Sequence, residues 1–204
     1  MEKSIEKIIE RLNDGNIGVI ASDTLFGLVG RASNAEIVEK IYTIKKRDVH
    51  KPCIILINDI KQLDDFYVIL NARFQDFLQK VWPGPVTVIL RIDEQYLEQY
   101  EYLHRGTGEL TFRLPDNARL QKVIEGVGPI IAPSANPEGK TPAVSVEDIR
   151  KYFGDDVDIY IDPKDTPYTG QPSTIIKIKD DTINLIREGV IPFEDITAIW
   201  TSLL

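Results

Sequence analysis

A short polar turn in this chain combines residue types that can bind an anion. Pro133-Ser134-Ala135-Asn136 follows directly on the apolar run 130–132 and has a further proline on each side, at 129 and 137. A buried strand that ends in a proline-braced turn holds a hydroxyl, a carboxamide and free backbone N–H groups in fixed positions. We therefore expect this turn to recognise an oxyanion or a nucleotide.

Two other segments carry hydroxyl, carboxylate and cationic side chains. Ser22-Asp23-Thr24 follows the apolar run 17–21, so it lies where α/β proteins often bind ligands, at the carboxyl end of a strand. An ordinary turn or helix cap uses the same residue types. Residues 45–51, Lys-Lys-Arg-Asp-Val-His-Lys, form the densest basic stretch of an acidic chain. This contrast favours phosphate binding, and the alternative is a set of cations that cap the C-terminus of a helix.

Further polar residues fall on or next to predicted strands. Arg113 lies in the apolar run 110–114, where an arginine is typical of an exposed edge strand; the alternative is a bidentate clamp on a carboxylate. Ser173-Thr174 and Arg187-Glu188-Gly189 repeat the pattern of polar groups at strand ends. Trp82-Pro83-Gly84-Pro85 predicts an architectural turn between a helix and a strand, with the indole in the core.

Several motif-based functions find no support. Ser134 lacks the Gly-x-Ser-x-Gly pattern of a nucleophile elbow, and no base role can be assigned to His50 or His104. The chain contains neither a P-loop nor a Gly-x-Gly-x-x-Gly fingerprint. One cysteine and two histidines leave little material for a zinc site, so we expect no metal held by a protein cage. A nucleotide would have to be held by dispersed cations, hydroxyls and backbone amides.

The composition bounds the class of protein. With 204 residues, 43% of them hydrophobic, the chain can bury one substantial core, and we predict a single domain over residues 1–204. The net charge of -8 argues against a broad nucleic-acid surface, so any RNA contact should be weak and local. No apolar run approaches the roughly 18 residues that cross a bilayer, and the N-terminus lacks a secretory signal. We expect no membrane contact and a reducing, cytoplasmic location.

Hydrophobic periodicity predicts the elements that position these residues. Strands are predicted at 17–21, 53–57, 86–92, 110–114, 130–132 and 159–161, and a hairpin of 174–179 with 182–187 around Asp180-Asp181. Helices are predicted at 5–12, after Asn34, around 74–81, at 117–124 and 146–152, and in the tail 193–204. This alternation indicates an α/β fold, a sheet covered by helices, and the hairpin makes the sheet mixed.

Taken together, seven short blocks in this order resemble the YrdC/Sua5 family. The blocks are Ser22-Asp23-Thr24-x-Phe26-Gly27-Leu28, Lys45-x-Arg47 with Lys51-Pro52, Trp82-Pro83-Gly84-Pro85-x-Thr87, Arg113-x-Pro115, Ser134-Ala135-Asn136 with Gly139, Ser173-Thr174 and Arg187-x-Gly189. They span nearly the whole chain and are most similar to the short, single-domain threonylcarbamoyl-AMP synthases. The resemblance implies no additional C-terminal Sua5 domain.

The resemblance also implies a fold and a reaction. The family fold is an open, twisted, mixed sheet whose flanking helices enclose a concave cleft. The family reaction converts L-threonine, bicarbonate and ATP into threonylcarbamoyl-adenylate and diphosphate, with Mg²⁺ on the phosphates. The adenylate serves partner proteins that modify adenosine 37 to t6A in tRNAs reading codons that begin with A.

Residue roles follow from the same resemblance. It implies a central nucleotide-handling, catalytic group of Lys45, Arg47, Ser134 and Asn136. It implies ATP binding by Arg47, Lys51, Ser134, Asn136, Ser173 and Arg187. It implies threonine binding by Thr24, Arg113 and Ser173. Replacing Lys45 or Arg47 by alanine should lower adenylate formation strongly while leaving thermal stability largely unchanged.

The sequence departs from the family pattern at five positions: Ala21, Ser22, Phe26, Asp48 and Leu56. Asp48 puts a carboxylate beside the expected phosphate site, which weakens the positive field there. Leu56 stands where longer relatives carry a histidine that contacts threonine. Two other functions stay open: a YrdC-like module that binds RNA in RNA or ribosome maturation, and a sister enzyme with a different carbamoyl or acyl acceptor.

Overall fold

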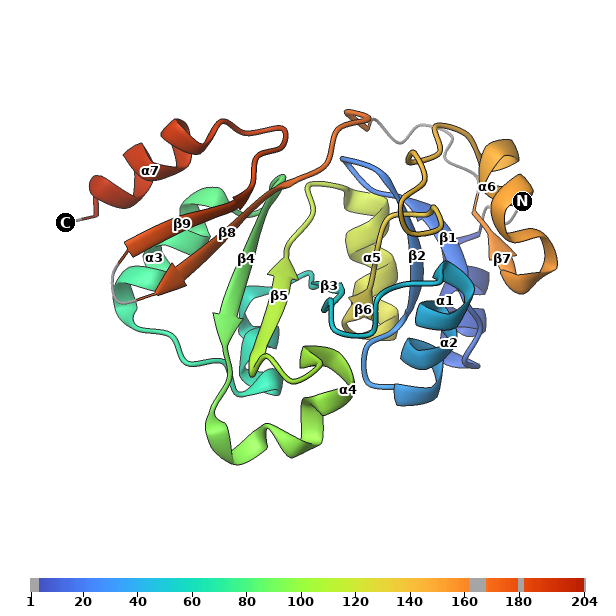
Figure 1. Ribbon diagram of the computed structural model, residues 1–204, viewed down its shortest axis with the longest axis horizontal. Coiled ribbons are helices and arrows are strands. Elements are labelled where there is room, and N and C mark those ends of the chain that lie inside the picture. The colour runs from blue at the N-terminus through green and yellow to red at the C-terminus, as the bar shows by residue number, and fades with distance from the viewer. Residues whose placement is uncertain (1–3, 162–167, 180–181, 204) are drawn as a thin grey trace.

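In a computed structural model, residues 4–161, 168–179 and 182–203 are described, and their strands form one mixed sheet (Figure 1). The strands are β1 (Gly18–Ala21), β2 (Phe26–Arg31), β3 (Ile54–Leu56), β4 (Val86–Arg91), β5 (Glu109–Arg113), β6 (Ile130–Ile131), β7 (Ile159–Tyr160), β8 (Thr174–Lys179) and β9 (Thr182–Arg187). Their order across the sheet is β7-β1-β2-β6-β3-β5-β4-β8-β9. Three neighbouring pairs are parallel (β1 with β7, β3 with β5, β4 with β8), and the others are antiparallel. The predicted mixed α/β sheet is confirmed.

Most of the described helices begin after residues whose side chains cap them. They are α1 (Ile5–Asn13), α2 (Ala35–Lys45), α3 (Ala72–Val81), α4 (Glu101–His104), α5 (Ala118–Val127), α6 (Val146–Phe153) and α7 (Phe193–Thr201). Side chains of Ser4, Asn34, Asn71, Asn117 and Ser145 accept backbone N–H groups of the first turns. Within the described ranges, no helix is long and apolar enough to span a membrane.

The alternation of side chains along β4 and β5 separates the two faces of the sheet. Leu110 and Phe112 of β5 point into a core shared with α2, α3 and α7, while Thr111 and Arg113 point to the opposite face. On that opposite face, α1 and α5 pack over the half of the sheet that contains β1, β2 and β6. Figure 1 shows that α1 and α5 lie toward one end of the molecule and α3 and α7 toward the other. The face of β4, β5 and β8 beyond α5 is therefore open to a ligand.

Two sequence-based expectations differ from the structure. β2 was not predicted, because its glycines at 27 and 30 and the preceding polar residues are typical of a loop. Arg113 was expected on an exposed edge strand or as a clamp on a carboxylate. The edge expectation is wrong: β5 lies between β3 and β4, and Arg113 is only 3% exposed. The predicted β8–β9 hairpin is confirmed by the antiparallel pairing of its strands, and Asp180-Asp181 lies outside the described residues.

The segment after β9 returns very close to the start of β8. Gly189 N donates to Thr174 Oγ1 at 3.0 Å, and Val190 N donates to Pro172 O at 2.9 Å. A Cβ atom on Gly189 would lie 2.1 Å from Pro172 O and 2.5 Å from Ser173 C. Since these neighbours are backbone atoms, only glycine fits, which explains the glycine of the Arg187-x-Gly189 block.

We expect Gly189→Ala to destabilise the protein by about 1–3 kcal/mol, because the added methyl forces the backbone at 172–173 away from β9. The measurement is the free energy of unfolding in urea. Gly27→Ala is the matched control, since its Cβ would meet Ala132 Cβ at 3.4 Å, an ordinary contact. Equal losses for the two variants would contradict the close-approach explanation.

Candidate functional site

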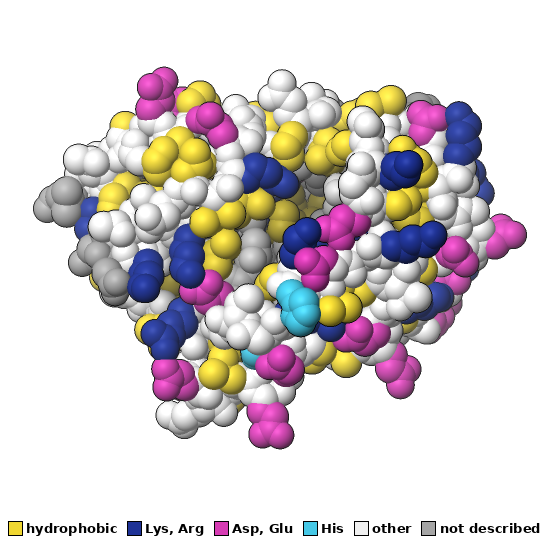
Figure 2. Space-filling model, viewed as in Figure 1, with side chains coloured by type: hydrophobic (Ala, Val, Ile, Leu, Met, Phe, Trp, Pro, Cys, Tyr) yellow, Lys and Arg dark blue, Asp and Glu magenta, His cyan; other side chains and the backbone are white. Residues whose placement is uncertain are grey.

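A cleft of about 500 Å³ lies on the open face of the sheet. Its walls include seven of the predicted site residues: Thr24, Arg47, Lys51, Arg113, Ser134, Ser173 and Arg187. Apolar side chains of the sheet, among them Ile54, Leu56, Ile89 and Ile175, also line the cleft. Figure 2 shows the hollow near the middle of this face, with Lys and Arg side chains on two sides of it and acidic side chains beside some of them.

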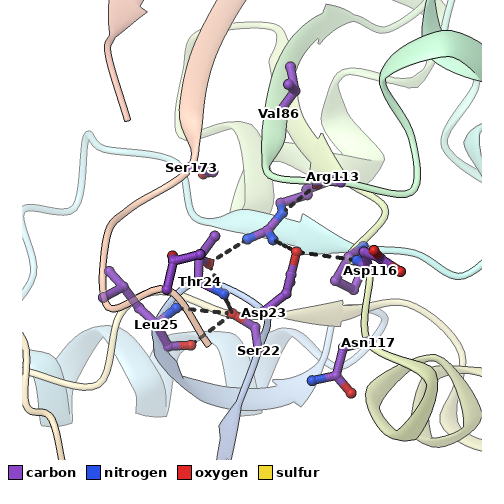
Figure 3. A network of polar contacts seen from close by, with 12 residues as sticks. Ser22, Asp23, Thr24, Leu25, Val86, Arg113, Asp116, Asn117 and Ser173 are labelled. Carbon is purple, nitrogen blue, oxygen red and sulfur yellow. Dashed lines mark hydrogen bonds and ion pairs between the residues drawn. The ribbon is translucent and has the colours of Figure 1, made fainter. Parts of the chain in front are cut away.

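Arg113 is a buried guanidinium whose nitrogens are held by two separate segments (Figure 3). Nη1 donates to Thr24 Oγ1 at 2.6 Å, and Nε donates to Gly84 O at 3.0 Å. Nη2 forms an ion pair with Asp23 Oδ2 at 2.5 Å. Burial lowers the pKa of Arg113, and Asp23 acts in the opposite direction. The sequence left a bidentate clamp on a carboxylate as the alternative. Within the described residues Arg113 pairs with a carboxylate, Asp23, but through one oxygen only, because its other nitrogens bind Thr24 and Gly84.

The turn between β1 and β2 presents Asp23 and Thr24 to this guanidinium. Ser22 Oγ accepts the backbone N–H groups of Thr24 at 3.1 Å and Leu25 at 3.2 Å and lies 3.0 Å from Thr24 Oγ1. The residues that precede β8 also hold this turn, since Thr169 N donates to Asp23 O and Gly170 N to Thr24 O, each at 3.0 Å. The segment is thus both an ordinary serine-stabilised turn and a wall of the cleft.

A second cation approaches the cleft from β9. Arg187 Nη2 donates to Ser173 O at 2.8 Å and lies 3.4 Å from Ser173 Oγ. Ser173 is 3% exposed, and its hydroxyl also pairs with Thr87 Oγ1 at 2.8 Å. Burial, and then the nearby charge of Arg113, lower the pKa of Arg187. Two guanidinium groups therefore lie near enough to influence each other, as expected of a site prepared for an anion.

Lys45 lies behind the wall of the cleft and holds the polar turn in place. Its ammonium donates to Ser134 O at 2.7 Å and to Asn136 O at 2.5 Å, and lies 3.4 Å from Ser134 Oγ. Only 2% of Lys45 is exposed. Burial, and next the charge of Arg47, lower its pKa to about 8. Because three acceptors surround a buried ammonium, we expect Lys45→Ala to destabilise the protein, unlike the sequence-based expectation of unchanged stability.

The polar turn is also joined to β2 and braced internally. Leu28 N donates to Pro133 O and Ala135 N to Phe26 O, at 2.9 and 2.8 Å. The Asn136 amide donates to Lys140 O at 2.6 Å, while its buried Oδ1 has no hydrogen-bond partner among the described residues. Ser134 thus faces the cleft from a turn that is fixed on both sides, and Asn136 lies in the second layer.

Arg47 and Lys51 come from the segment that follows α2. The Arg47 guanidinium donates to Lys51 O and Pro52 O, each at 3.0 Å, and the Tyr42 hydroxyl donates to the same Lys51 carbonyl at 2.8 Å. The Lys51 ammonium pairs with Glu138 at 2.6 Å. The cations of this basic segment thus bind groups outside α2, with Lys45 inside and Arg47 and Lys51 at the cleft.

Sequence reasoning did not assign a role to Asp23, Thr87 or Glu138, although each contacts a predicted site residue. Asp23 had a local signal, since it is the one carboxylate within the first block. Thr87 lies 86 positions from Ser173, and Glu138 lies 87 positions from Lys51. Contacts over such separations depend on strand order, which the sequence pattern does not specify.

The carboxylates near the cleft are already paired with cations. Asp23 pairs with Arg113, and Glu109 pairs with Lys177 at 2.6 Å. Within the described residues no group of three or more His, Cys, Asp or Glu side chains could hold a metal ion. A divalent cation at this site would therefore depend on oxygens of a bound ligand and on water.

We expect Asp23→Asn to cost about 3 kcal/mol of stability, at the low end for breaking a buried pair, because Arg113 keeps its bonds to Thr24 and Gly84. Urea unfolding measures the loss. The double variant Asp23→Leu/Arg113→Met removes both charges and should cost less than the sum of the two single changes. A loss below about 0.5 kcal/mol for Asp23→Asn would show that the pair is not needed.

Comparisons with known proteins agree with the geometry. The Sua5/YciO/YrdC family model, described as "Telomere recombination", matches residues 10–189. A Methanocaldococcus jannaschii protein named "Putative threonylcarbamoyl-AMP synthase" is 33% identical over 197 residues, covering 95% of this chain and 89% of that protein. The threonylcarbamoyl-AMP synthase of Bacillus subtilis is 30% identical over 189 residues, which cover 92% of this chain and 54% of that protein.

A solved structure is similar over the same range. Sua5 of P. abyssi, crystallised in complex with L-threonine, superposes with a TM-score of 0.86 at 27% sequence identity. The match covers 96% of this chain and 56% of that one. The family model, the relatives and the fold agree, and the chain belongs to the Sua5/YciO/YrdC family.

Proposed function

We propose that this chain is a threonylcarbamoyl-AMP synthase, which forms threonylcarbamoyl-adenylate and diphosphate from L-threonine, bicarbonate and ATP. The observation that carries the proposal is the convergence of Arg47, Lys51, Arg113 and Arg187 with several hydroxyl side chains on one cleft. This set suits substrates that carry a carboxylate and a triphosphate. The names of the relatives from M. jannaschii and B. subtilis support the same activity.

The proposed chemistry needs charge stabilisation and positioning more than a nucleophilic side chain. The threonine amine attacks CO₂ formed from bicarbonate and loses a proton, which gives a carbamate. A carbamate oxygen then attacks the α-phosphorus of ATP, the bond to the bridging oxygen breaks, and diphosphate leaves. Negative charge builds up on the phosphoryl oxygens, where cations and backbone N–H groups stabilise it.

The two sides of the cleft suit the two substrates. Arg113, held by Asp23, Thr24 and Gly84, is oriented to offer its remaining N–H groups to the threonine carboxylate, and Ser173 lies on the same side. Arg47, Lys51, Ser134 and Arg187 are assigned to the phosphates. Asn136 and Lys45 are then residues that position the Ser134 turn rather than residues that line the cleft.

Magnesium belongs to this proposal as a companion of the triphosphate. The paired carboxylates of the cleft favour a cation held mainly by phosphate oxygens and water. Bound in that way, it would neutralise charge on the phosphates and assist the departure of diphosphate.

The biological setting is part of the same proposal. The adenylate would pass to partner proteins that complete t6A on tRNA, in the cytoplasm, where the buried free thiol of Cys53 stays reduced. The alternative of an RNA-binding module is less favoured, because the net charge is -8 and Figure 2 shows acidic side chains mixed with the basic ones around the hollow. The other alternative, a sister enzyme, would bind a different carbamoyl or acyl acceptor in place of threonine.

Incubation with labelled bicarbonate, L-threonine and MgATP should yield labelled threonylcarbamoyl-adenylate, detected by chromatography. Arg47→Ala should reduce the rate about 100-fold or more, because a positioned cation is lost at the phosphates. Lys80→Ala, which changes a last-turn lysine of α3 away from the cleft, is the control.

The proposed function fails if no adenylate forms while an active family member makes it under the same conditions. Serine and valine in place of threonine test the sister enzyme. Faster turnover of either would move the assignment to that amino acid.

The charge state of Lys45 should be visible in nucleotide binding. With a folded pKa of about 8 against 10.5 for the ordinary side chain, Lys45 loses its charge as the pH rises past about 8, and the affinity for a non-hydrolysable ATP analogue should fall. Folding stability should not fall for this reason, since the folded state binds fewer protons than the unfolded state between these two pKa values and gains stability there. Calorimetry from about pH 7 to about pH 9.5 measures both effects.

Lys45→Arg is the control for this pH dependence, because a guanidinium stays charged over the range. Its affinity for the analogue should be independent of pH, whatever its absolute value. An identical fall in both proteins would assign the titration to another group.

A further inference from the structure

Two carboxylates face Lys51 at the edge of the cleft. Lys51 lines the cleft, and its Nζ lies 2.6 Å from Glu138 Oε1 and 3.7 Å from Asp48 Oδ2. Glu138 Oε2 in turn accepts the backbone N–H of Asp48 at 2.5 Å. One carboxylate therefore engages a cation and a backbone N–H group together.

This pair of partners is the one that an oxyanion of a ligand would use. Backbone N–H groups at a turn, together with an ammonium, are a common binding arrangement for phosphate. Lys51 lowers the pKa of Glu138, and Glu138 raises the pKa of Lys51, so both side chains are charged at neutral pH. In the protein without ligand, Glu138 thus supplies the negative charge at this point.

The backbone holds Glu138 in place, while its ion pair is exposed enough to open. Glu138 N donates to Lys45 O at 3.0 Å, which fixes the residue beside the end of α2. The side chains of Lys51 and Glu138 are 57% and 30% exposed. An ion pair of this exposure is weak, so a ligand with several negative charges can replace it.

We propose that Glu138 sets the affinity of the nucleotide site, because its carboxylate competes with the triphosphate for the Lys51 ammonium. Asp48 adds to the effect from the other side of Lys51. The inference rests on the proposed function for the identity of the ligand. Glu138 and Asp48 thus oppose nucleotide binding, because the Lys51 ammonium can contact a phosphate only when its ion pair with Glu138 opens.

The test is calorimetric binding of a non-hydrolysable ATP analogue and of inorganic triphosphate to Glu138→Gln. Glutamine keeps an acceptor for the Asp48 N–H but carries no charge. We expect both ligands to bind about twofold to about fivefold more tightly. Asp48→Asn, a second variant, should give a smaller change of the same sign, because Asp48 lies farther from the ammonium.

Two controls isolate the mechanism. Glu147→Gln makes the same change of charge on the exposed first turn of α6, outside the cleft, and should leave both affinities unchanged. In a Lys51→Met background, Glu138→Gln should no longer tighten binding if it acts through this ammonium.

Unchanged or weaker binding by Glu138→Gln with a normal thermal transition would overturn the inference, as would tightening that persists without Lys51. If Glu138→Gln fails to fold, Asp48→Asn decides by the same criteria. These binding measurements need no turnover, so they separate this inference from the proposed function. Tighter triphosphate binding by Glu138→Gln with no adenylate formed would contradict only the proposed synthase activity. No binding of either ligand to the unaltered protein would contradict both proposals.

Discussion

Arg113 places a permanent charge in the interior of the sheet, and much of the cleft is arranged around it. A buried guanidinium is tolerated only when carboxylate and hydrogen-bonding partners replace its water. Here the partners are Asp23 and Thr24, from the turn between β1 and β2, and Gly84, from the turn before β4. These turns lie on different halves of the sheet, so satisfying one charge also fixes the distance between the two walls of the cleft.

Lys45 repeats the arrangement on the other side of the site. Its ammonium is buried under the turn that carries Ser134, and it is satisfied by two carbonyl oxygens of that turn. In both cases a cation from one element fixes a turn from another. Lys45 lies behind the wall of the cleft, whereas Arg47, Arg113 and Arg187 line it. Cations that are held by fixed turns in this way are typical of a preorganised electrostatic site.

Local patterns were enough to predict most elements and the existence of the site. Helix starts such as Asn34 and Asn117 followed from capping chemistry, and the β8–β9 hairpin followed from alternation around a turn. The ordered polar blocks also contained most of the polar residues that line the cleft. These local patterns do not specify the order of the strands. β5 is an interior strand, so Arg113 is buried and not at the exposed edge where it was expected. The same reason hid the pairing of Lys51 with Glu138.

Electron density from crystals soaked with L-threonine and a non-hydrolysable ATP analogue would show directly where the two substrates bind. We expect the threonine carboxylate at Arg113 and Thr24, and the phosphates between Arg47, Ser134 and Arg187. Ligand density outside this cleft, or a threonine carboxylate that does not contact Arg113, would contradict this expectation.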